Sequence, residues 1–156
     1  MATFSTGGGS QIAVSAALPD TFTQAGYEAL TFTDLPSVAE IPEQAAGYES
    51  VTFVKLQDDA TDSVRGTANL IDIELAVYDG QRDNAGYLAL KAAFDATKGT
   101  DAERIALKVA NAAGTVTLYY TMRVFSMNEG ARTGGEITSV GVMLQGPFNT
   151  RVLVES

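Results

Sequence analysis

The chain has 156 residues, 46% of them hydrophobic and 19% charged, so it is long enough for one domain with its own core and too short for two. It contains no Cys and no His, which excludes disulfides, thiolate or imidazole metal sites and the Ser-His-Asp and Cys-His catalytic relays. Nineteen acids against ten bases give a formal net charge of −9, a sign that opposes binding to nucleic acid phosphates.

No segment of the sequence predicts export or insertion into a membrane. The amino-terminal residues carry neither a basic stretch nor an apolar run, so they lack both main parts of a secretory signal. The most apolar stretch, 70–78, is interrupted by Asp72 and Glu74. It is far shorter than the roughly 20 residues of a membrane-spanning helix. We therefore expect a soluble protein with no membrane partner.

Apolar residues at every second position predict β-strands in the first half of the chain. A Gly-rich arm, 1–9, precedes a strand over 10–18. The region 21–44 mixes short β-prone pieces with prolines and is predicted to be a strand fragment with an extended loop. Residues 48–56 are again typical of a strand.

The clearest predicted strand, 67–78, follows a polar loop at 55–66. Within this strand, apolar residues occupy one face, and Asp72 and Glu74 lie on the other. Such alternation indicates that one side is buried and that the other is wet or paired.

The second half of the chain combines the one predicted helix with a hairpin. Asp83 or Asn84 supplies the N-cap, and apolar residues then recur at helical spacing up to a stop near Gly99. Two alternating runs, 105–109 and 116–124, are joined by a turn and predict a β-hairpin.

A last strand over 136–145 ends before Pro147 and leaves a carboxyl-terminal arm, 147–156. About six or seven strands and one helix predict a mainly β (α+β) fold. We expect an antiparallel β-sandwich or small barrel with one flanking α-helix, in a single domain that spans 1–156.

Two groups of carboxylates are candidates for chemistry. Asp58, Asp59 and Asp62 offer the oxygen ligands that Ca²⁺ prefers, but their spacing misses the EF-hand pattern and lacks its closing Glu. Asp72 and Glu74 form a pair of the kind that a glycosidase needs, yet neighbouring acids on one strand face are usually just a polar face. We predict no metal, no cofactor and no catalytic residues, and hence a chain that is not an enzyme.

Several short pieces follow one another in a recognisable order along nearly the whole chain. They are 12–15, 29–35, 38–43, 48–53, the loop 55–66, the helix start 83–87, 124–127 and 137–140. In this order they resemble the tail tube proteins, or major tail proteins, of long-tailed bacteriophages with non-contractile tails. The resemblance implies a phage tail tube fold, which the tube protein of type VI secretion shares.

That resemblance implies a structural virion protein that self-assembles into stacked rings, commonly of six. The rings form the tail tube through which DNA passes to the host without specific binding. The implied partners are other copies of the chain and the tape measure, tail tip and terminator proteins. The implied location is the virion tail, after synthesis in the host cytoplasm.

The resemblance assigns contacts between rings to the arms 1–9 and 147–156 and to the loop 55–66. Within the loop, the candidate stacking residues are Gln57, Asp58, Asp59, Asp62 and Arg65.

Asp72 and Glu74 are candidates to line the channel, because an acidic wall leaves DNA loosely held and mobile. The alternative is that they keep the outer surface soluble. The alternative function is a β-sandwich capsid decoration or binding module, which would share the alternation and the acidity without self-assembly. An enzyme that uses carboxylates is the third possibility.

Overall fold

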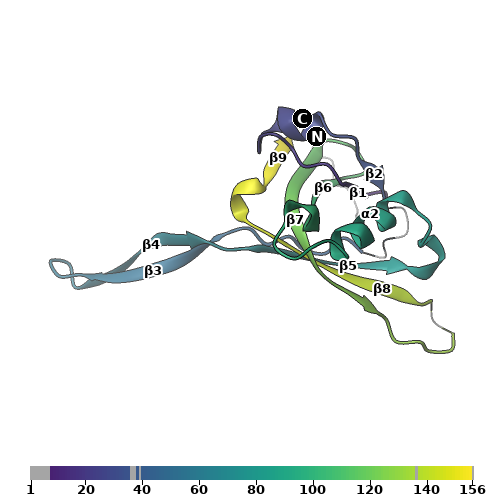
Figure 1. The fold of residues 1–156 in the computed structure, drawn as a ribbon. Helices are drawn as coiled ribbons and strands as arrows, with labels where there is room; N and C mark the ends of the chain where they lie inside the picture. Colours follow the sequence, from purple (N-terminus) through teal and green to yellow (C-terminus); the bar gives the residue numbers. More distant parts are fainter. Residues whose placement is uncertain (1–7, 36–37, 39, 136, 156) are drawn as a thin grey trace.

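The structure is a computed structural model that describes residues 8–35, 38, 40–135 and 137–155 (Figure 1). Antiparallel strands dominate it and confirm the predicted mainly β fold class. The strands are β1 (Gln11–Ser15), β2 (Thr33–Asp34), β3 (Tyr48–Lys55), β4 (Ala60–Ala68), β5 (Ile71–Tyr78), β6 (Arg104–Ala110), β7 (Val116–Glu129), β8 (Ser139–Gly146) and β9 (Val152–Glu155). The helices are α1 (Gln24–Glu28) and α2 (Ala85–Phe94), with short 3-10 turns η1 (Asp79–Gln81), η2 (Asp101–Glu103) and η3 (Phe148–Thr150).

One sheet of seven strands forms the body, in the order β2-β1-β6-β7-β8-β5, with β9 beside the first part of β7. The long strand β7 pairs first with β6 and then with β8, and a bulge between Val124 and Ser126 accompanies the second pairing. Beyond β2, Val38 forms a bridge to Val77 of β5. The two ends of the strand order therefore meet, and the sheet curls toward a barrel.

The core lies on the inner face of this curled sheet. On β5 the side chains of Ile71, Ile73, Leu75 and Val77 are buried, and Asp72 and Glu74 between them face outward, as the alternation predicts. The buried side chains from the strands and α2 form one cluster: Ile12, Val14, Leu35, Ile71, Ile73, Leu75, Val77, Tyr87, Leu90, Ala93, Ile105, Leu107, Tyr120, Met122, Val124, Val140, Val142 and Leu144. Each large aliphatic side chain buried in this way stabilises the fold by about 1.5–3 kcal/mol.

Helix α2 begins where the sequence predicts it. The Asn84 side-chain oxygen accepts hydrogen bonds from the backbone N–H groups of Gly86 at 2.9 Å and Tyr87 at 3.4 Å, so Asn84 is the N-cap. The helix ends at Phe94, before the predicted stop near Gly99. Gly99 instead takes a positive φ of 83° in the turn that follows, a conformation that suits glycine.

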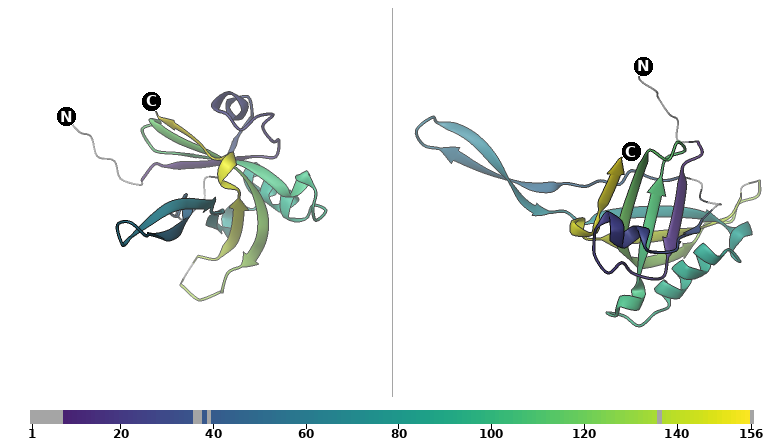
Figure 2. Two further views of the ribbon diagram at one scale, coloured as in Figure 1. Left: turned by 90° about the vertical axis from the view of Figure 1, so that its left-hand side faces the viewer. Right: turned by 90° about the horizontal axis from the view of Figure 1, so that it is seen from above.

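The segment 55–66 is not the polar loop that the sequence predicts. The turn occupies only 56–59, with Asp59 at a φ of 50°, and the chain then returns as β4. Strands β3 and β4 pair from Tyr48 opposite Ala68 to Lys55 opposite Ala60. The predicted strand 67–78 is correspondingly two strands, because β4 ends before β5 begins. The pair β3–β4 projects from the body as a long β-hairpin (Figures 1 and 2).

The segment 147–156 is not a separate arm over its described part, which ends at residue 155. After the turn η3, strand β9 pairs antiparallel with β7, from Tyr119 opposite Val152 to Val116 opposite Glu155. This pairing holds the segment against the body. Of the predicted amino-terminal arm 1–9, residues 1–7 lie outside the described residues.

Helix α1, which the sequence analysis did not predict, packs on the outer face of the sheet. Its residue Tyr27 is fully buried and forms a second, smaller cluster with Ala106 of β6 and Tyr119 of β7. The rings of Tyr27 and Tyr119 are stacked, with centroids 5.2 Å apart. The body is therefore covered on both faces at this end of the sheet.

Candidate assembly surface

The β3–β4 hairpin is the element most exposed to solvent. Among the described residues, its two strands pair only with each other, so both outer edges are unpaired. An isolated two-stranded hairpin is marginally stable in water. Unpaired edges are also ready templates for another chain. The hairpin is thus suited to contact with another molecule.

The two faces of the hairpin differ in polarity. Val51 lies opposite Val64, and Phe53 follows on the same face. These side chains are 50%, 54% and 43% exposed, respectively. The other face presents mainly polar residues, such as the pair Thr52 and Ser63, together with Val54, which is 59% exposed. On the first face, Asp62 lies opposite Phe53. An apolar face held in solvent on a projecting element is typical of an interaction site.

The residues predicted to make ring contacts lie along this hairpin rather than in one loop. Gln57, Asp58 and Asp59 are in the turn at its tip, whereas Asp62 and Arg65 lie on β4. The structure thus brings three of them together at the tip and spaces the other two along the strand.

The charged residues on the strands make contacts within the chain. Lys55 Nζ lies 2.9 Å from Asp62 Oδ2, and this contact lowers the pKa of Asp62 below its ordinary value. The guanidinium of Arg65 lies 5.0 Å from the ring centroid of Tyr48. That ring in turn contacts Phe148 of the body, with centroids 5.1 Å apart. These contacts shape the hairpin and anchor its base.

The tip itself has side chains without partners among the described residues. Leu56 is 95% exposed. Within the described part of the chain, Asp58 and Asp59 form no salt bridge and no side-chain hydrogen bond. One apolar side chain and two free carboxylates are therefore offered at the far end of the hairpin.

The predicted channel-lining residues lie on the outward face of β5. Asp72 and Glu74 are both exposed, and Gln145 Nε2 of β8 donates a hydrogen bond to Asp72 Oδ1 at 2.7 Å. Gln145 lies opposite Asp72 on one side and opposite Arg123 of β7 on the other, so the three residues form a row across the strands. The structure thus places both carboxylates away from the core, on a polar strip that crosses neighbouring strands.

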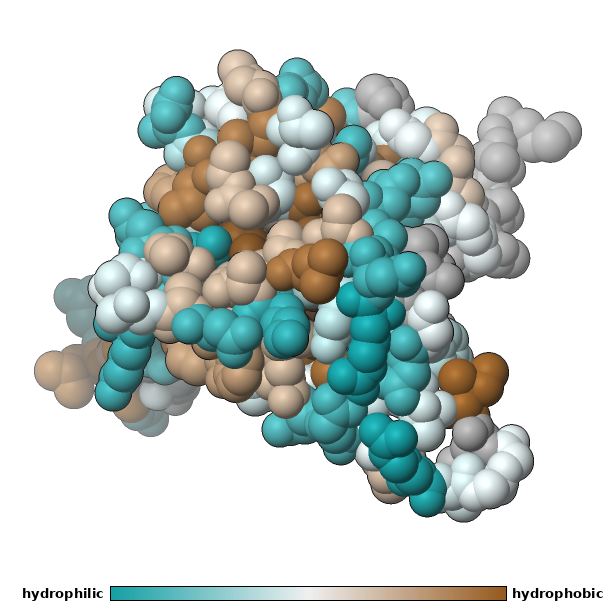
Figure 3. Space-filling model, turned by 45° about the vertical axis from the view of Figure 1, so that its right-hand side comes forward, coloured by the Kyte–Doolittle hydropathy of each residue, from teal (hydrophilic) through white to brown (hydrophobic). Residues whose placement is uncertain are grey.

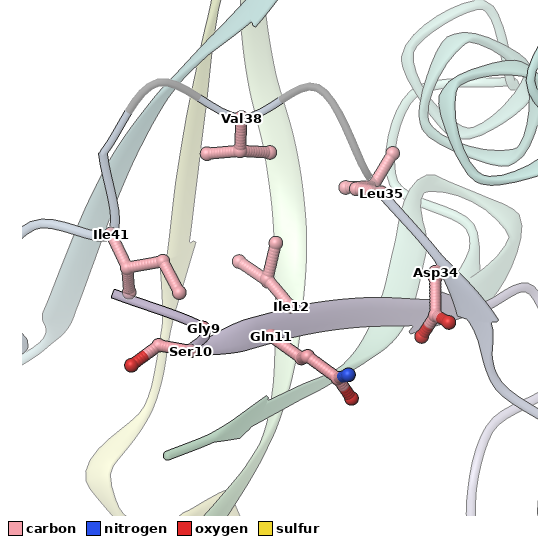
Figure 4. A pocket seen from close by; sticks show the side chains of 8 residues that line it. All are labelled: Gly9, Ser10, Gln11, Ile12, Asp34, Leu35, Val38 and Ile41. Carbon is pink, nitrogen blue, oxygen red and sulfur yellow. The ribbon is translucent and has the colours of Figure 1, made fainter. Parts of the chain in front are cut away.

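A cavity of about 310 Å³ lies between β1 and the chain that follows β2 (Figure 4). The aliphatic side chains of Ile12, Leu35 and Val38 point into it, while those of Gln11 and Asp34 point to the other side of β1. Its lining holds one carboxylate and no second acid or base, so it offers no pair for proton transfer.

The described residues form neither a metal site nor a membrane-spanning helix. No three acidic side chains there are grouped so that they could hold a metal ion. No described helix is long and apolar enough to cross a membrane.

Solved tail structures match this architecture at low sequence identity. The tail tube of SPP1 has a TM-score of 0.67 at 12% identity, over 97% of this chain and 79% of that chain. The chain has the tail tube fold. The sheath-tube complex of PVC, an extracellular contractile injection system, matches with a TM-score of 0.61 at 11% identity, over 94% of this chain and 89% of that chain.

The tail of a GTA particle, solved with C6 symmetry, also has a similar fold. Its TM-score is 0.59 at 13% identity, over 93% of this chain and 95% of that chain. No protein-family model matches the sequence, and no curated protein sequence matches it either. The tail tube fold is therefore shared with both a phage tail and a contractile system, so it does not by itself indicate a non-contractile tail.

The apolar face of the hairpin is the feature that the sequence analysis missed. A signal was present, because Val51 and Phe53 alternate before the acidic turn and Val64 follows it. The residues around Val64 are polar and show no alternation of apolar side chains, so the sequence did not predict a second strand there.

Proposed function

We propose that this chain is a structural subunit of a phage tail tube and that it self-assembles into stacked rings. The observation that carries the proposal is the β3–β4 hairpin. It projects from a tail tube fold with unpaired edges and an exposed apolar face, and no described part of the chain covers it. Contact with a second copy would bury that face and stabilise the hairpin.

The hairpin and the body are different surfaces, so the contact between copies is head to tail. Such a contact closes into a ring when its rotation permits and otherwise extends into a filament. Rings of six are the form that we propose, and the C6 symmetry of the GTA tail, which has a similar fold, supports that number.

The remaining features follow from the proposed tube. We place the chain in the virion tail of a long-tailed phage of the non-contractile type, made in the host cytoplasm, with tape measure, tail tip and terminator proteins as partners. DNA passes through the tube without specific binding, which agrees with the net charge of −9. Asp72 and Glu74 line the channel, and the chain has no enzymatic role.

Size-exclusion chromatography and negative-stain microscopy of the concentrated protein test this proposal. We expect rings or tubes built from repeats of subunit size. A chain that stays monomeric at every concentration would instead favour a capsid decoration or binding module and overturn the proposal.

A shortened variant tests the part played by the hairpin. Ser50 lies opposite Arg65, so residues 51–64 can be replaced by the two-residue turn Asn-Gly without changing the register. We expect this variant to fold, with the circular dichroism melting curve of the body retained, and to form no rings or tubes. Tubes formed as readily as by the parent chain would show that the hairpin makes no assembly contact.

A further inference from the structure

A groove on the body has the size and lining to receive a side chain from another molecule. It has a volume of about 450 Å³ and lies between the end of α2, the turn that leads to η2, and β7. Its lining includes Phe94, Ala96, Lys98, Glu103, Arg123 and Phe125.

Two solvent-exposed aromatic side chains give this groove an apolar surface. Phe94 is the last residue of α2 and is 43% exposed. Phe125 sits in the β7 bulge between Val124 and Ser126 and is 54% exposed. Neighbouring residues of a strand point to opposite faces, so Phe125 faces solvent while Val124 is buried. Figure 3 shows hydrophobic side chains gathered over the middle of the side of the body that carries α2.

The groove also offers a positive charge. Arg123 is paired with Glu103, whereas Lys98 forms no salt bridge with any described residue. Lys91, on the last turn of α2, does not line this groove but the adjacent one, which shares Phe94 and also holds the exposed Asp95. Lys91 is likewise without an ion pair among the described residues. In a chain with a net charge of −9, two unpaired lysines beside exposed aromatic rings favour an acidic partner that also carries an apolar group.

The tip of the hairpin has this chemistry. Leu56 is the apolar group, and Asp58 and Asp59 are the free carboxylates beside it. The tip lies far from α2 in both the front view and the view from above (Figures 1 and 2). A chain therefore does not fill its own groove, and the tip must come from another copy.

We propose that the hairpin tip of one copy docks in the groove between α2 and β7 of a neighbouring copy. Leu56 contacts Phe94 and Phe125, while Asp58 and Asp59 face Lys98 and Lys91. This inference rests on the proposed self-assembly and names the surface that receives the hairpin. The contact joins two different surfaces, so it repeats from copy to copy along a ring or tube.

Disulfide trapping tests the contact directly, because the chain has no native Cys. In Leu56→Cys with Ala96→Cys, one cysteine is at the tip and the other is in the groove. We expect assembled protein to give a ladder of disulfide-linked oligomers on a non-reducing gel after mild oxidation. The matched control is Leu56→Cys with Ala112→Cys, since Ala112 is exposed in the turn between β6 and β7. The control should give no ladder above the background of single-cysteine variants.

Charge reversal supplies a second readout. Asp58→Lys with Asp59→Lys should raise the concentration needed for assembly by about tenfold or more, which corresponds to about 1.4 kcal/mol or more. Adding Lys91→Glu with Lys98→Glu should restore assembly toward that of the parent. Circular dichroism melting curves would show that each variant still folds.

The outcomes separate this inference from the proposed function. If the parent assembles and the Ala96 and Ala112 pairs cross-link equally, or if the lysine changes give no rescue, the groove is not the receiving surface and the tube function stands. If the parent never assembles, the proposed function and this contact are both overturned.

Discussion

At the scale of single residues, Tyr27 shows how one hydroxyl holds α1 to the body. Tyr27 Oη donates a hydrogen bond to the Thr150 carbonyl oxygen at 2.7 Å, and the hydroxyl of Thr121 lies 2.8 Å away. Since the tyrosine has one proton to give, Thr121 is the donor in the second bond. Burial raises the pKa of Tyr27, so the hydroxyl stays neutral. The bonds join α1, β7 and η3, which are distant in sequence.

Removal of this hydroxyl should therefore be costly. We expect Tyr27→Phe to lower the free energy of unfolding by about 1–3 kcal/mol, because buried groups of Thr121 and Thr150 lose their partner. Urea unfolding measures the change. The control is Tyr119→Phe, which removes a hydroxyl for which the structure shows no hydrogen bond and should cost less than about 0.5 kcal/mol. Equal losses in the two variants would contradict this account.

A second residue-scale feature is the charged cluster at the end of β5. Asp79 accepts hydrogen bonds from the hydroxyl of Thr138 and from Arg82, whose Nη2 is 2.7 Å away. Arg82 Nη1 also donates to Glu129 of β7 at 3.0 Å. The Thr138 hydroxyl and then Arg82 lower the pKa of Asp79, and Arg82 lowers the pKa of Glu129. The cluster connects η1 to the ends of β7 and β8.

The lowered pKa values of Asp79 and Glu129 predict how the stability of the fold changes with pH. A carboxylate whose pKa is lower in the folded chain contributes stability at neutral pH, and that contribution is lost as the pH falls through the folded pKa. We expect Asp79→Asn to be less stable than the parent at neutral pH and to approach it as the pH is lowered to about 3. Urea midpoints across this range measure the difference. A difference that does not change with pH would exclude an ionic role for Asp79.

At the scale of elements, the sequence predicts those that bury one face. The β5 alternation places Ile71 and Val77 correctly in the core, and the Asn84 cap correctly predicts the start of α2. Strand β4 was missed because it has no buried face: Asp62 and Arg65 are solvent-exposed on opposite faces of the hairpin. Period-two patterns report burial, so a strand that is exposed on both faces leaves little signal.

The other two missed elements have different causes. Helix α1 has only five residues, fewer than a helical repeat needs to show itself, and Tyr27 is its single buried side chain. Strand β9 is held by pairing with β7, which lies far away in the sequence. Local composition carries no information about such a partner, so the sequence analysis predicted a free arm at 147–156.

The hairpin allows folding and assembly to be separated. Val51 and Phe53 are exposed in the single chain, so Val51→Ser with Phe53→Ser should change the free energy of unfolding of the body by less than about 0.5 kcal/mol. The same variant should lose rings and tubes, because the apolar contact with a neighbour is gone. The matched control on the polar face is Thr52→Ala with Ser63→Ala, which should assemble. Chemical unfolding and negative-stain microscopy measure the two effects, and tubes formed by the serine variant would contradict the prediction.

At the scale of the whole molecule, the chain divides into two parts. The body has its own core and covered sheet faces, whereas the hairpin leaves its edges unpaired and its apolar side chains exposed. The body closes its strand order through the bridge from Val38 to Val77 and covers its sheet with α1 and α2. The hairpin has no core of its own, and no described element of the chain covers it. In the proposed tube, association of copies can therefore begin after the body has folded, with the hairpin gaining its stability from the neighbour.

The outward face of β5 allows the proposed channel to be tested on assembled tubes. Asp72→Lys with Glu74→Lys changes the net charge from −9 to −5, because each substitution adds two positive units. Asp20→Lys with Glu28→Lys makes the same change at exposed positions near α1 and is the matched control. Both variants should still form tubes, since none of these side chains is in the core.

If Asp72 and Glu74 line the channel, their replacement by lysine puts a basic wall around the DNA. Duplex DNA carries one charge per about 1.7 Å, so even a few lysines in each ring would hold it through many contacts. We expect short duplex DNA to co-sediment with the Asp72→Lys, Glu74→Lys tubes, to be protected there from DNase, and to be released by salt. DNA bound by the control tubes should be digested, because it lies outside. Digestion in both cases would place Asp72 and Glu74 on the outer surface, where their role is to keep the tube soluble.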